Sequence, residues 1–159
     1  MLRHYVPRND DIPVIRKAKA EDLEAVRACA RAAYAHYVER IGREPAPMVA
    51  DFGASIAAGD LDVIEADAEL AGYVVSYPQG DHLHLENVAV HPDYQGRGLG
   101  YRLIEHVEQK ARQQGLDHVE LYTNAKMTEN LELYPRLGYH QFDRRVEDGF
   151  DRVYFSKKT

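Results

Sequence analysis

Residues 85–100 read L-E-N-V-A-V-H-P-D-Y-Q-G-R-G-L-G, and this stretch decides the fold of the chain. Its first half has the apolar composition of a strand, which stops at His91-Pro92 because proline has no N–H to donate. From Leu99 onward, apolar residues recur at three- and four-residue intervals, a pattern typical of a helix, which here ends at Gly115. A strand, a glycine-rich turn and a helix are therefore expected in series.

The turn in this stretch has the properties of an anion-binding site. The first N–H groups of a helix lack partners and carry a partial positive charge, so they attract an anion if nothing bulky blocks it. Gly96, Gly98 and Gly100 keep that approach open. Two well-known phosphate loops do not match, because a Walker loop needs a lysine after Gly100 and the dinucleotide-binding fingerprint needs a glycine where Tyr101 stands.

Outward from the turn, the sequence predicts alternating strands and helices. Helices are expected after Glu21-Asp22 as far as Tyr37, from Met48 to Gly59, over 99–115 and over 128–137. Strands are expected at 12–16, 61–66, 70–77, 82–91, 119–123, 139–145 and 152–156. Short links predict that the strands between 61 and 91 form an antiparallel meander, and Glu147-Asp148-Gly149 predicts a final hairpin.

Two motifs within this order of strands and helices resemble motifs of the GCN5-related N-acetyltransferase (GNAT) family. The first is Q-G-R-G-L-G at 95–100 after N-V-A-V-H-P, and the second is L-Y-P-R-L-G-Y at 133–139, which matches the family's L-Y-x-x-x-G-[FY]. The resemblance covers nearly the whole chain. It implies an α+β fold, a mixed α/β sandwich in which about four helices flank a twisted, mostly antiparallel sheet of about seven strands. Strands 4 and 5 are expected to splay apart at a bulge near Val88 to Val90.

The resemblance implies an N-acetyltransferase that moves the acetyl group of acetyl-CoA to an amine by direct attack in a ternary complex. By the same resemblance, N–H groups from Gly96 to Tyr101 bind the pyrophosphate, and the fourth strand pairs with the pantetheine. The implied cofactor-binding residues are Val88, Ala89, Val90, Gln95, Gly96, Arg97, Gly98, Leu99, Gly100, Tyr101, Asn130 and Tyr134. A cofactor-binding asparagine of many relatives is replaced here by Met127, and Asn130 or Asn124 is expected to substitute for it.

Acetyl transfer also requires a polarised thioester, a deprotonated amine and a proton for the departing thiolate. By family resemblance, the backbone N–H of Val90 is the oxyanion donor. Tyr134 is the expected proton donor, since a phenol is protonated at neutral pH.

For the base, His82, His84 and Glu86 alternate along one strand and are expected on one face. Glu86 is the first choice, because it stands one alternation step from Val88 and two from Val90, with His84 or water as alternatives. The same His-x-His pair fits no zinc motif, so no metal site is predicted.

The composition predicts one soluble domain over residues 1–159, with 1–11 as an N-terminal extension. The chain is 45% hydrophobic and 29% charged, as in globular proteins, and its net charge of −6 argues against a nucleic-acid partner. No apolar run is long enough to span a membrane. Residues 1–11 lack the apolar segment of a secretory signal and the single Cys29 forms no internal disulfide, so a cytoplasmic location is predicted.

The sequence does not identify the acceptor, which is expected to be a small-molecule or peptide amine. Part of the set Tyr34, His36, Tyr37, Met48 and Phe52 is expected to face it, because aromatic residues at helical spacing more often belong to the core. Two alternatives stay open: a CoA-responsive binding module without catalysis, and an acyltransferase with another acyl-CoA or a non-amine acceptor. A homodimer, common in the family, is also compatible with the sequence.

Overall fold

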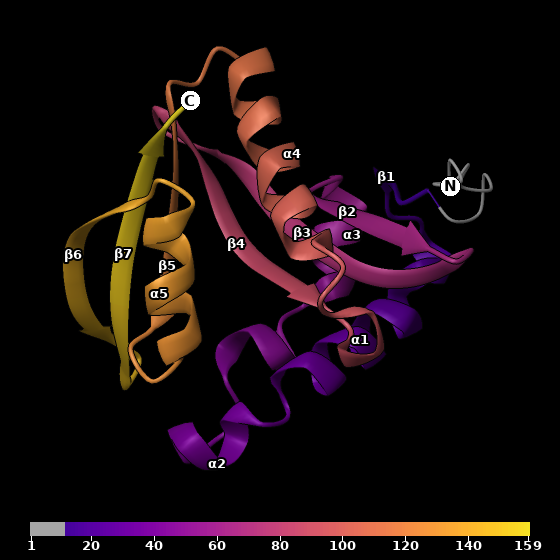
Figure 1. Ribbon diagram of the computed structural model, residues 1–159, viewed down its shortest axis with the longest axis horizontal. Coiled ribbons are helices and arrows are strands. Elements are labelled where there is room, and N and C mark those ends of the chain that lie inside the picture. The colour runs from indigo at the N-terminus through magenta and orange to yellow at the C-terminus, as the bar shows by residue number, and fades with distance from the viewer. Residues whose placement is uncertain (1–11) are drawn as a thin grey trace, which may run out of the picture.

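The computed structural model describes residues 12–159, which form a seven-stranded sheet with helices on both faces (Figure 1). The predicted extension, residues 1–11, lies outside the described residues. The strands are β1 (Val14–Lys17), β2 (Leu61–Ala66), β3 (Glu69–Gln79), β4 (His82–Val90), β5 (His118–Asn124), β6 (His140–Glu147) and β7 (Phe150–Lys158). The helices are α1 (Leu23–Tyr34), α2 (Tyr37–Ile41), α3 (Phe52–Ala58), α4 (Leu99–Gln113) and α5 (Thr128–Arg136), with short 3₁₀ turns η2 (Ala20–Asp22), η3 (Ala46–Val49) and η4 (Pro92–Tyr94).

The strands lie in the order β1-β2-β3-β4-β5-β7-β6, and all neighbours are antiparallel except β4 and β5. This confirms the predicted fold class and element order. Two helix predictions were wrong in detail. The first helix ends at Tyr34, and Tyr37 begins a separate short helix. Met48 lies in η3 rather than in α3, because the backbone is extended at Ala50 and Asp51 begins a new helix by accepting the Ala54 N–H on its side chain.

The predicted splay between β4 and β5 is confirmed. The two strands pair over three positions only, which are Leu83↔Val119, His84↔Glu120 and Leu85↔Leu121. Beyond these pairs the strands separate, and Figure 1 shows them together at the top of the view and apart below it. The second half of β4 therefore has a free edge that faces α5.

The bulge that accompanies the splay lies earlier in β4 than predicted. The β3–β4 register steps from Val75↔Asn87 to Ser76↔Leu85, so Glu86 is the extra residue, whereas the prediction placed the bulge near Val88 to Val90. An extra residue inverts the alternation of side chains that follow it.

This inversion corrects the predicted faces of β4. Leu85 and Val88 pack in the same core beneath α4, although they are an odd number of residues apart, while Ala89 packs in the core on the α1 side. Simple alternation had predicted that Glu86 shares a face with Val88 and Val90. Because of the bulge, it does not.

Each face of the sheet has its own hydrophobic core. On one face, α4 contributes Leu103, Ile104 and Val107 to a cluster that also contains Tyr134 of α5. On the other face, α1 and α3 cover the first four strands, with Val26 and Phe52 among the buried residues. None of the helices within residues 12–159 has both the length and the apolar composition needed to cross a membrane.

The turn between β2 and β3 stores backbone strain that a single substitution is expected to relieve. Asp67 and Ala68 both have positive φ, 54° and 63°, and the matching β6–β7 turn has Asp148-Gly149 at 53° and 78°. Since alanine disfavours this conformation, Ala68→Gly is expected to raise the free energy of unfolding by about 1 kcal/mol, or Tm by roughly 2–4 °C.

Thermal unfolding followed by circular dichroism measures this effect. The control is Ala57→Gly on the exposed side of α3, where the same exchange should instead destabilise by up to about 1 kcal/mol. A lower Tm for Ala68→Gly would show that the turn is not strained.

Candidate active site

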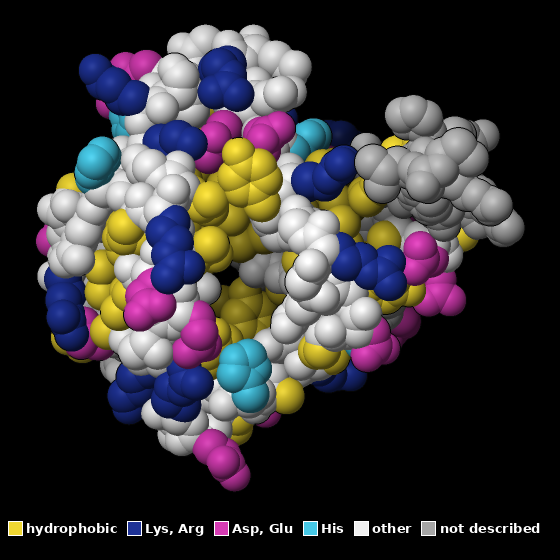
Figure 2. Space-filling view, in the orientation of Figure 1, with side chains coloured by type: hydrophobic (Ala, Val, Ile, Leu, Met, Phe, Trp, Pro, Cys, Tyr) yellow, Lys and Arg dark blue, Asp and Glu magenta, His cyan; other side chains and the backbone are white. Residues whose placement is uncertain are grey.

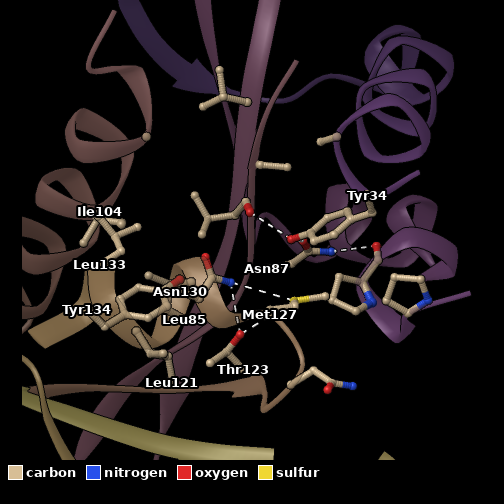
Figure 3. Close-up of a pocket in the computed structure, with 18 of the residues that line it drawn as sticks. Tyr34, Leu85, Asn87, Ile104, Leu121, Thr123, Met127, Asn130, Leu133 and Tyr134 are labelled. Carbon is tan, nitrogen blue, oxygen red and sulfur yellow. Dashed lines mark hydrogen bonds between the residues drawn. The ribbon is translucent and has the colours of Figure 1, made fainter. Parts of the chain in front are cut away.

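A cavity of about 640 Å³ opens where β4 separates from β5. The second half of β4, the glycine loop with the start of α4, the end of β5, α5 and the α1–α2 segment all contribute to its wall (Figure 3). Figure 2 shows the hollow in the molecular surface, with apolar side chains in its depth. Its volume is in the range of cofactor and small-molecule sites.

The structure brings all but one of the predicted cofactor-binding and catalytic residues to this cavity. Those in its wall are Glu86, Val88, Ala89, Val90, Gln95, Gly96, Gly98, Leu99, Gly100, Tyr101, Asn130 and Tyr134. Arg97 is the exception. Its guanidinium donates to Asp67 Oδ2 at 2.9 Å and lies over the Tyr94 ring, so the exposed β2–β3 turn holds it outside the cavity.

Of the loop glycines, Gly100 gives the clearest indication of a ligand. Gly96 and Gly98 have φ values of 84° and 77°, which favour glycine whether or not anything binds. Gly100 has ordinary helical backbone, and a Cβ there would meet nothing closer than Val90 Cγ2 at 3.7 Å. Neither conformation nor packing requires glycine at position 100, and its missing side chain leaves open space beside the start of α4. An anion fits such a helix start.

The backbone of β4 presents polar groups to the same space. His91 N–H donates to Ala71 O of β3 at 2.8 Å, and N–H groups of successive strand residues point to opposite sides. The N–H of Val90 therefore points away from β3, toward the gap between β4 and β5. The Val88 and Val90 carbonyls accept bonds from Tyr34 Oη at 2.9 Å and Gln95 Nε2 at 3.2 Å.

Tyr134 forms part of the cavity wall on α5. Its ring is buried against the rings of Tyr139 and Phe155, each with a centroid distance of 5.7 Å. Figure 3 shows the phenol pointing into the cavity. Burial raises the pKa of Tyr134 to about 12, so the hydroxyl keeps its proton throughout the neutral range.

Between the two candidate asparagines, the geometry favours Asn130. Its Nδ2 donates to Thr123 Oγ1 at 3.0 Å, which leaves the amide oxygen directed into the cavity (Figure 3). Asn124 Oδ1 already accepts the Lys126 N–H at 2.9 Å and shapes the turn before α5. Met127 is buried, with its sulfur next to Thr123 and Asn130.

A second cavity, of about 340 Å³, lies on the face of the sheet opposite α4 and meets the first. The two share Glu86, Leu121, Tyr122 and Arg152. Glu86 thus stands at their junction, where its Oε1 accepts a bond from Tyr77 Oη at 3.2 Å.

His84 lines the second cavity only. It is buried between the rings of Tyr77 and Tyr122, at centroid distances of 5.4 and 5.8 Å, and burial lowers its pKa to about 4. The imidazole is therefore neutral at neutral pH and has little access to solvent. Of the two predicted bases, Glu86 is the one that reaches the first cavity.

Asn87 is a site residue that sequence reasoning missed. Its Oδ1 accepts bonds from Tyr34 Oη at 3.2 Å and Tyr73 Oη at 3.0 Å, and its Nδ2 donates to Pro47 O at 3.0 Å (Figure 3). This buried amide connects β4 to β3, α1 and η3. The sequence did contain a signal for this role, because Asn87 is a polar residue within the apolar run of β4 and a buried amide needs hydrogen-bond partners.

Only part of the predicted acceptor-side set lines a cavity, and that it faces the acceptor stays a prediction. Tyr34, His36 and Tyr37 line the first cavity, whereas Phe52 is in the core against Tyr73 and Met48 packs at the edge of that core. Glu129 of α5 accepts bonds from Tyr37 and Arg40 of α2, the latter at 2.6 Å. These contacts join the two halves of the splayed sheet.

A family model described as the acetyltransferase (GNAT) family matches residues 17–139. This range includes the β4 residues that line the two cavities, the glycine loop and Tyr134. The chain belongs to the GNAT family. Its match to curated members is shorter, and the chain spans about half the length of the relatives it matches. It is 32% identical over 78 residues to the ribosomal protein bS18 alanine N-acetyltransferase of Salmonella typhimurium, over 49% of this chain and 53% of that enzyme. It is also 32% identical over 78 residues to streptothricin acetyltransferase of Streptomyces lavendulae, over 48% and 41% of the two chains.

Solved structures of GNAT proteins share this fold. The ribosomal-protein-S18-alanine N-acetyltransferase of Escherichia coli superposes with a TM-score of 0.69 at 20% identity, over 92% of this chain and 94% of that one. The PaiA N-acetyltransferase of Thermoplasma acidophilum, solved in complex with coenzyme A, gives a TM-score of 0.73 at 22% identity, over 93% and 99%. At these identities the likeness concerns the fold.

Proposed function

We propose that this GNAT chain is an acetyl-CoA-dependent N-acetyltransferase whose cosubstrate occupies the cavity between β4 and β5. The observation that carries the proposal is the meeting of three features in one cavity. These are the open helix start at Gly100, the gap-facing N–H of Val90 and the buried phenol of Tyr134. Coenzyme A in the PaiA structure supports the choice of cosubstrate.

The residues of the cavity wall support a position for each part of acetyl-CoA. The pyrophosphate lies at the N–H groups from Gly96 to Tyr101, where the helix start favours negative charge. The pantetheine follows Val88 to Val90 along the free edge of β4, with Asn130 opposite. Arg97 contacts the nucleotide phosphates only if its guanidinium releases its hydrogen bond to Asp67.

In the reaction, the acceptor nitrogen attacks the thioester carbonyl, a C–N bond forms and the C–S bond breaks. The Val90 N–H stabilises the oxyanion that develops on the carbonyl oxygen. Before the attack the ammonium gives one proton to Glu86, directly or through water, and after it the nitrogen loses a second proton by the same route; Glu86 releases both to solvent, and Tyr134 donates a proton to the departing sulfur. Solvent then returns the proton to Tyr134.

The acceptor enters through the second cavity, which meets the first at Glu86. Three carboxylates, of Glu86, Glu120 and Glu147, line that cavity beside the guanidinium groups of Arg145 and Arg152, and this small excess of negative charge favours a cationic amine. The curated relatives include an enzyme named for a protein alanine and one named for streptothricin, so both peptide and small-molecule amines belong in the test.

A thiol-release assay with acetyl-CoA and a panel of peptide and small-molecule amines tests this function. Release of CoA that depends on an amine, together with mass-spectrometric detection of the acetylated amine, is expected. Acetyl-CoA binding in calorimetry without release for any amine would favour a CoA-responsive binding module instead. Faster turnover with propionyl- or succinyl-CoA would reassign the acyl group.

Substitution of Glu86 tests the base. Glu86→Gln keeps the shape and the Tyr77 contact but removes the proton acceptor, so kcat/KM for the amine is expected to fall by about tenfold or more at pH 7. With a lysine-type amine the defect should shrink as pH approaches the amine pKa of about 10.4, because the amine then needs no base.

The matched control is Glu132→Gln on the exposed face of α5, which should leave the rate unchanged. An equal loss at pH 7 and at pH 10 for Glu86→Gln would argue against the base role.

A further inference from the structure

The two parallel strands at the centre of the sheet each begin with the same dipeptide. Asp81-His82 opens β4 and Asp117-His118 opens β5. Because Leu83 pairs with Val119, the two dipeptides lie side by side at the end of the β4–β5 ladder that stays closed. The imidazole rings of His82 and His118 are 5.2 Å apart between centroids and inclined by 31°.

The side chains at this closed end have the donors and the spacing of a metal site. Asp81 Oδ1 lies 3.0 Å from His82 Nδ1 and 3.8 Å from His118 Nε2. One donor atom from each of the three residues lies within 4.8 Å of the other two. The carboxylate of Glu120 adds contacts of 3.1 Å from Oε2 to His82 Nε2 and 3.1 Å from Oε1 to His118 Nε2. Asp81 thus lies on the Nδ1 side of His82 and Glu120 on its Nε2 side, and both carboxylates contact Nε2 of His118.

Burial and hydrogen bonding prepare both imidazoles for a ligand. The side chains of His82 and His118 are only 12% and 18% exposed. His82 Nε2 is buried and has no hydrogen-bond partner among residues 12–159, since its contact with Glu120 lacks hydrogen-bond geometry. His118 Nδ1 contacts Asp117 Oδ1 at 2.5 Å, the arrangement by which a carboxylate fixes a metal-binding imidazole and leaves Nε2 for the ion.

We propose that Asp81, His82 and His118, with Glu120 as the fourth side chain, bind a divalent transition metal, for which Zn²⁺ is the best match. Bonds of about 2.1 Å in a tetrahedron separate neighbouring ligand atoms by about 3.4 Å. The Glu120 oxygens lie 3.1 Å from Nε2 of His82 and 3.1 Å from Nε2 of His118, and Asp81 Oδ1 lies 3.8 Å from Nε2 of His118, all near that value. Two imidazoles favour zinc over calcium or magnesium, which prefer oxygen ligands. Two carboxylates balance the charge of the ion.

The site lies apart from the glycine loop, Val90 and Tyr134, and it shares only Glu120 with the wall of the second cavity. It has a structural consequence. It joins β4 to β5 at the three-residue ladder that holds the two halves of the sheet together. A bound ion therefore stabilises the end at which β4 and β5 are paired and leaves the gap between the strands beyond Leu85 unchanged. Metal binding is expected to stabilise the fold without being required for acetyl transfer.

Isothermal titration of zinc chloride into the tag-free, chelator-treated chain tests the site, with Tm as a second readout. We expect saturable binding of one Zn²⁺ per chain and a Tm rise of about 5 °C or more at 100-fold excess over Kd. Magnesium chloride should give neither effect. The variants His118→Asn and Asp81→Asn should each weaken zinc binding at least tenfold, and Asp81 is exposed enough that its substitution leaves the fold intact.

The control is His140→Asn, an exposed histidine at the start of β6, which should bind zinc as the unmodified chain does. Absence of saturable binding at about 100 µM zinc, or equal affinity in Asp81→Asn and in the unmodified chain, would overturn the proposal. Acetyl transfer measured with and without chelator is separate from these readouts, so failure of the metal site leaves the proposed function untouched.

Discussion

Tyr134→Phe is expected to lower kcat by about 100-fold or more while it changes the Kd for acetyl-CoA by less than about threefold. The substitution removes one hydroxyl from a ring that stays packed against Tyr139 and Phe155, so the cavity keeps its shape. What is lost is the proton for the departing thiolate. Because the pKa of Tyr134 is raised to about 12, the unmodified enzyme should show no loss of rate from ionisation of this phenol below about pH 11.

Steady-state kinetics and calorimetry with acetyl-CoA measure the two quantities separately. Tyr101→Phe is the matched control, since Tyr101 is exposed and only its backbone has an assigned role. A Tyr134→Phe enzyme with unchanged kcat would mean that another group, or water, protonates the thiolate. A large loss of acetyl-CoA affinity would instead place the hydroxyl in binding.

Gly100→Leu is expected to raise the Kd for acetyl-CoA by about 100-fold or more without lowering Tm. A side chain at position 100 enters the open space at the start of α4, where the pyrophosphate is proposed to lie. The fold should tolerate the change, because the backbone of Gly100 is helical and leucine favours a helix over glycine by up to about 1 kcal/mol.

The smaller variant Gly100→Ala serves as the graded control and should retain most of the affinity. Calorimetric titration with acetyl-CoA gives the affinities, and thermal unfolding gives the stability of each variant. Unchanged affinity in Gly100→Leu would exclude the start of α4 as the pyrophosphate site.

The features that could be predicted from the sequence depend on neighbouring residues. The strand, glycine turn and helix of residues 85–100 are local patterns, and the structure has them where they were expected. The bulge was misplaced because it depends on the pairing of β4 with β3, where Val75 meets Asn87 but Ser76 meets Leu85. No pattern within β4 alone carries that register, so the faces after Glu86 were also misassigned.

The residues of the candidate site also fall into two groups, those that could be predicted from local motifs and those that could not. The loop glycines and Tyr134 lie in contiguous motifs, and the structure places them on one cavity. The pairing of Arg97 with Asp67 and the network around Asn87 join segments far apart in sequence, so neither was foreseen. The neighbouring Asp-His dipeptides likewise become one cluster only through the parallel ladder.

The central claim is that acetyl-CoA occupies the cavity between β4 and β5 with its thioester between Val90 and Tyr134. A crystal structure of the chain with acetyl-CoA tests this most directly. The predicted result places the pyrophosphate at the first turn of α4 and the thioester oxygen within about 3.1 Å of Val90 N, with the sulfur next to Tyr134 Oη. A cosubstrate bound outside this cavity, or a thioester distant from both groups, would contradict the proposed function.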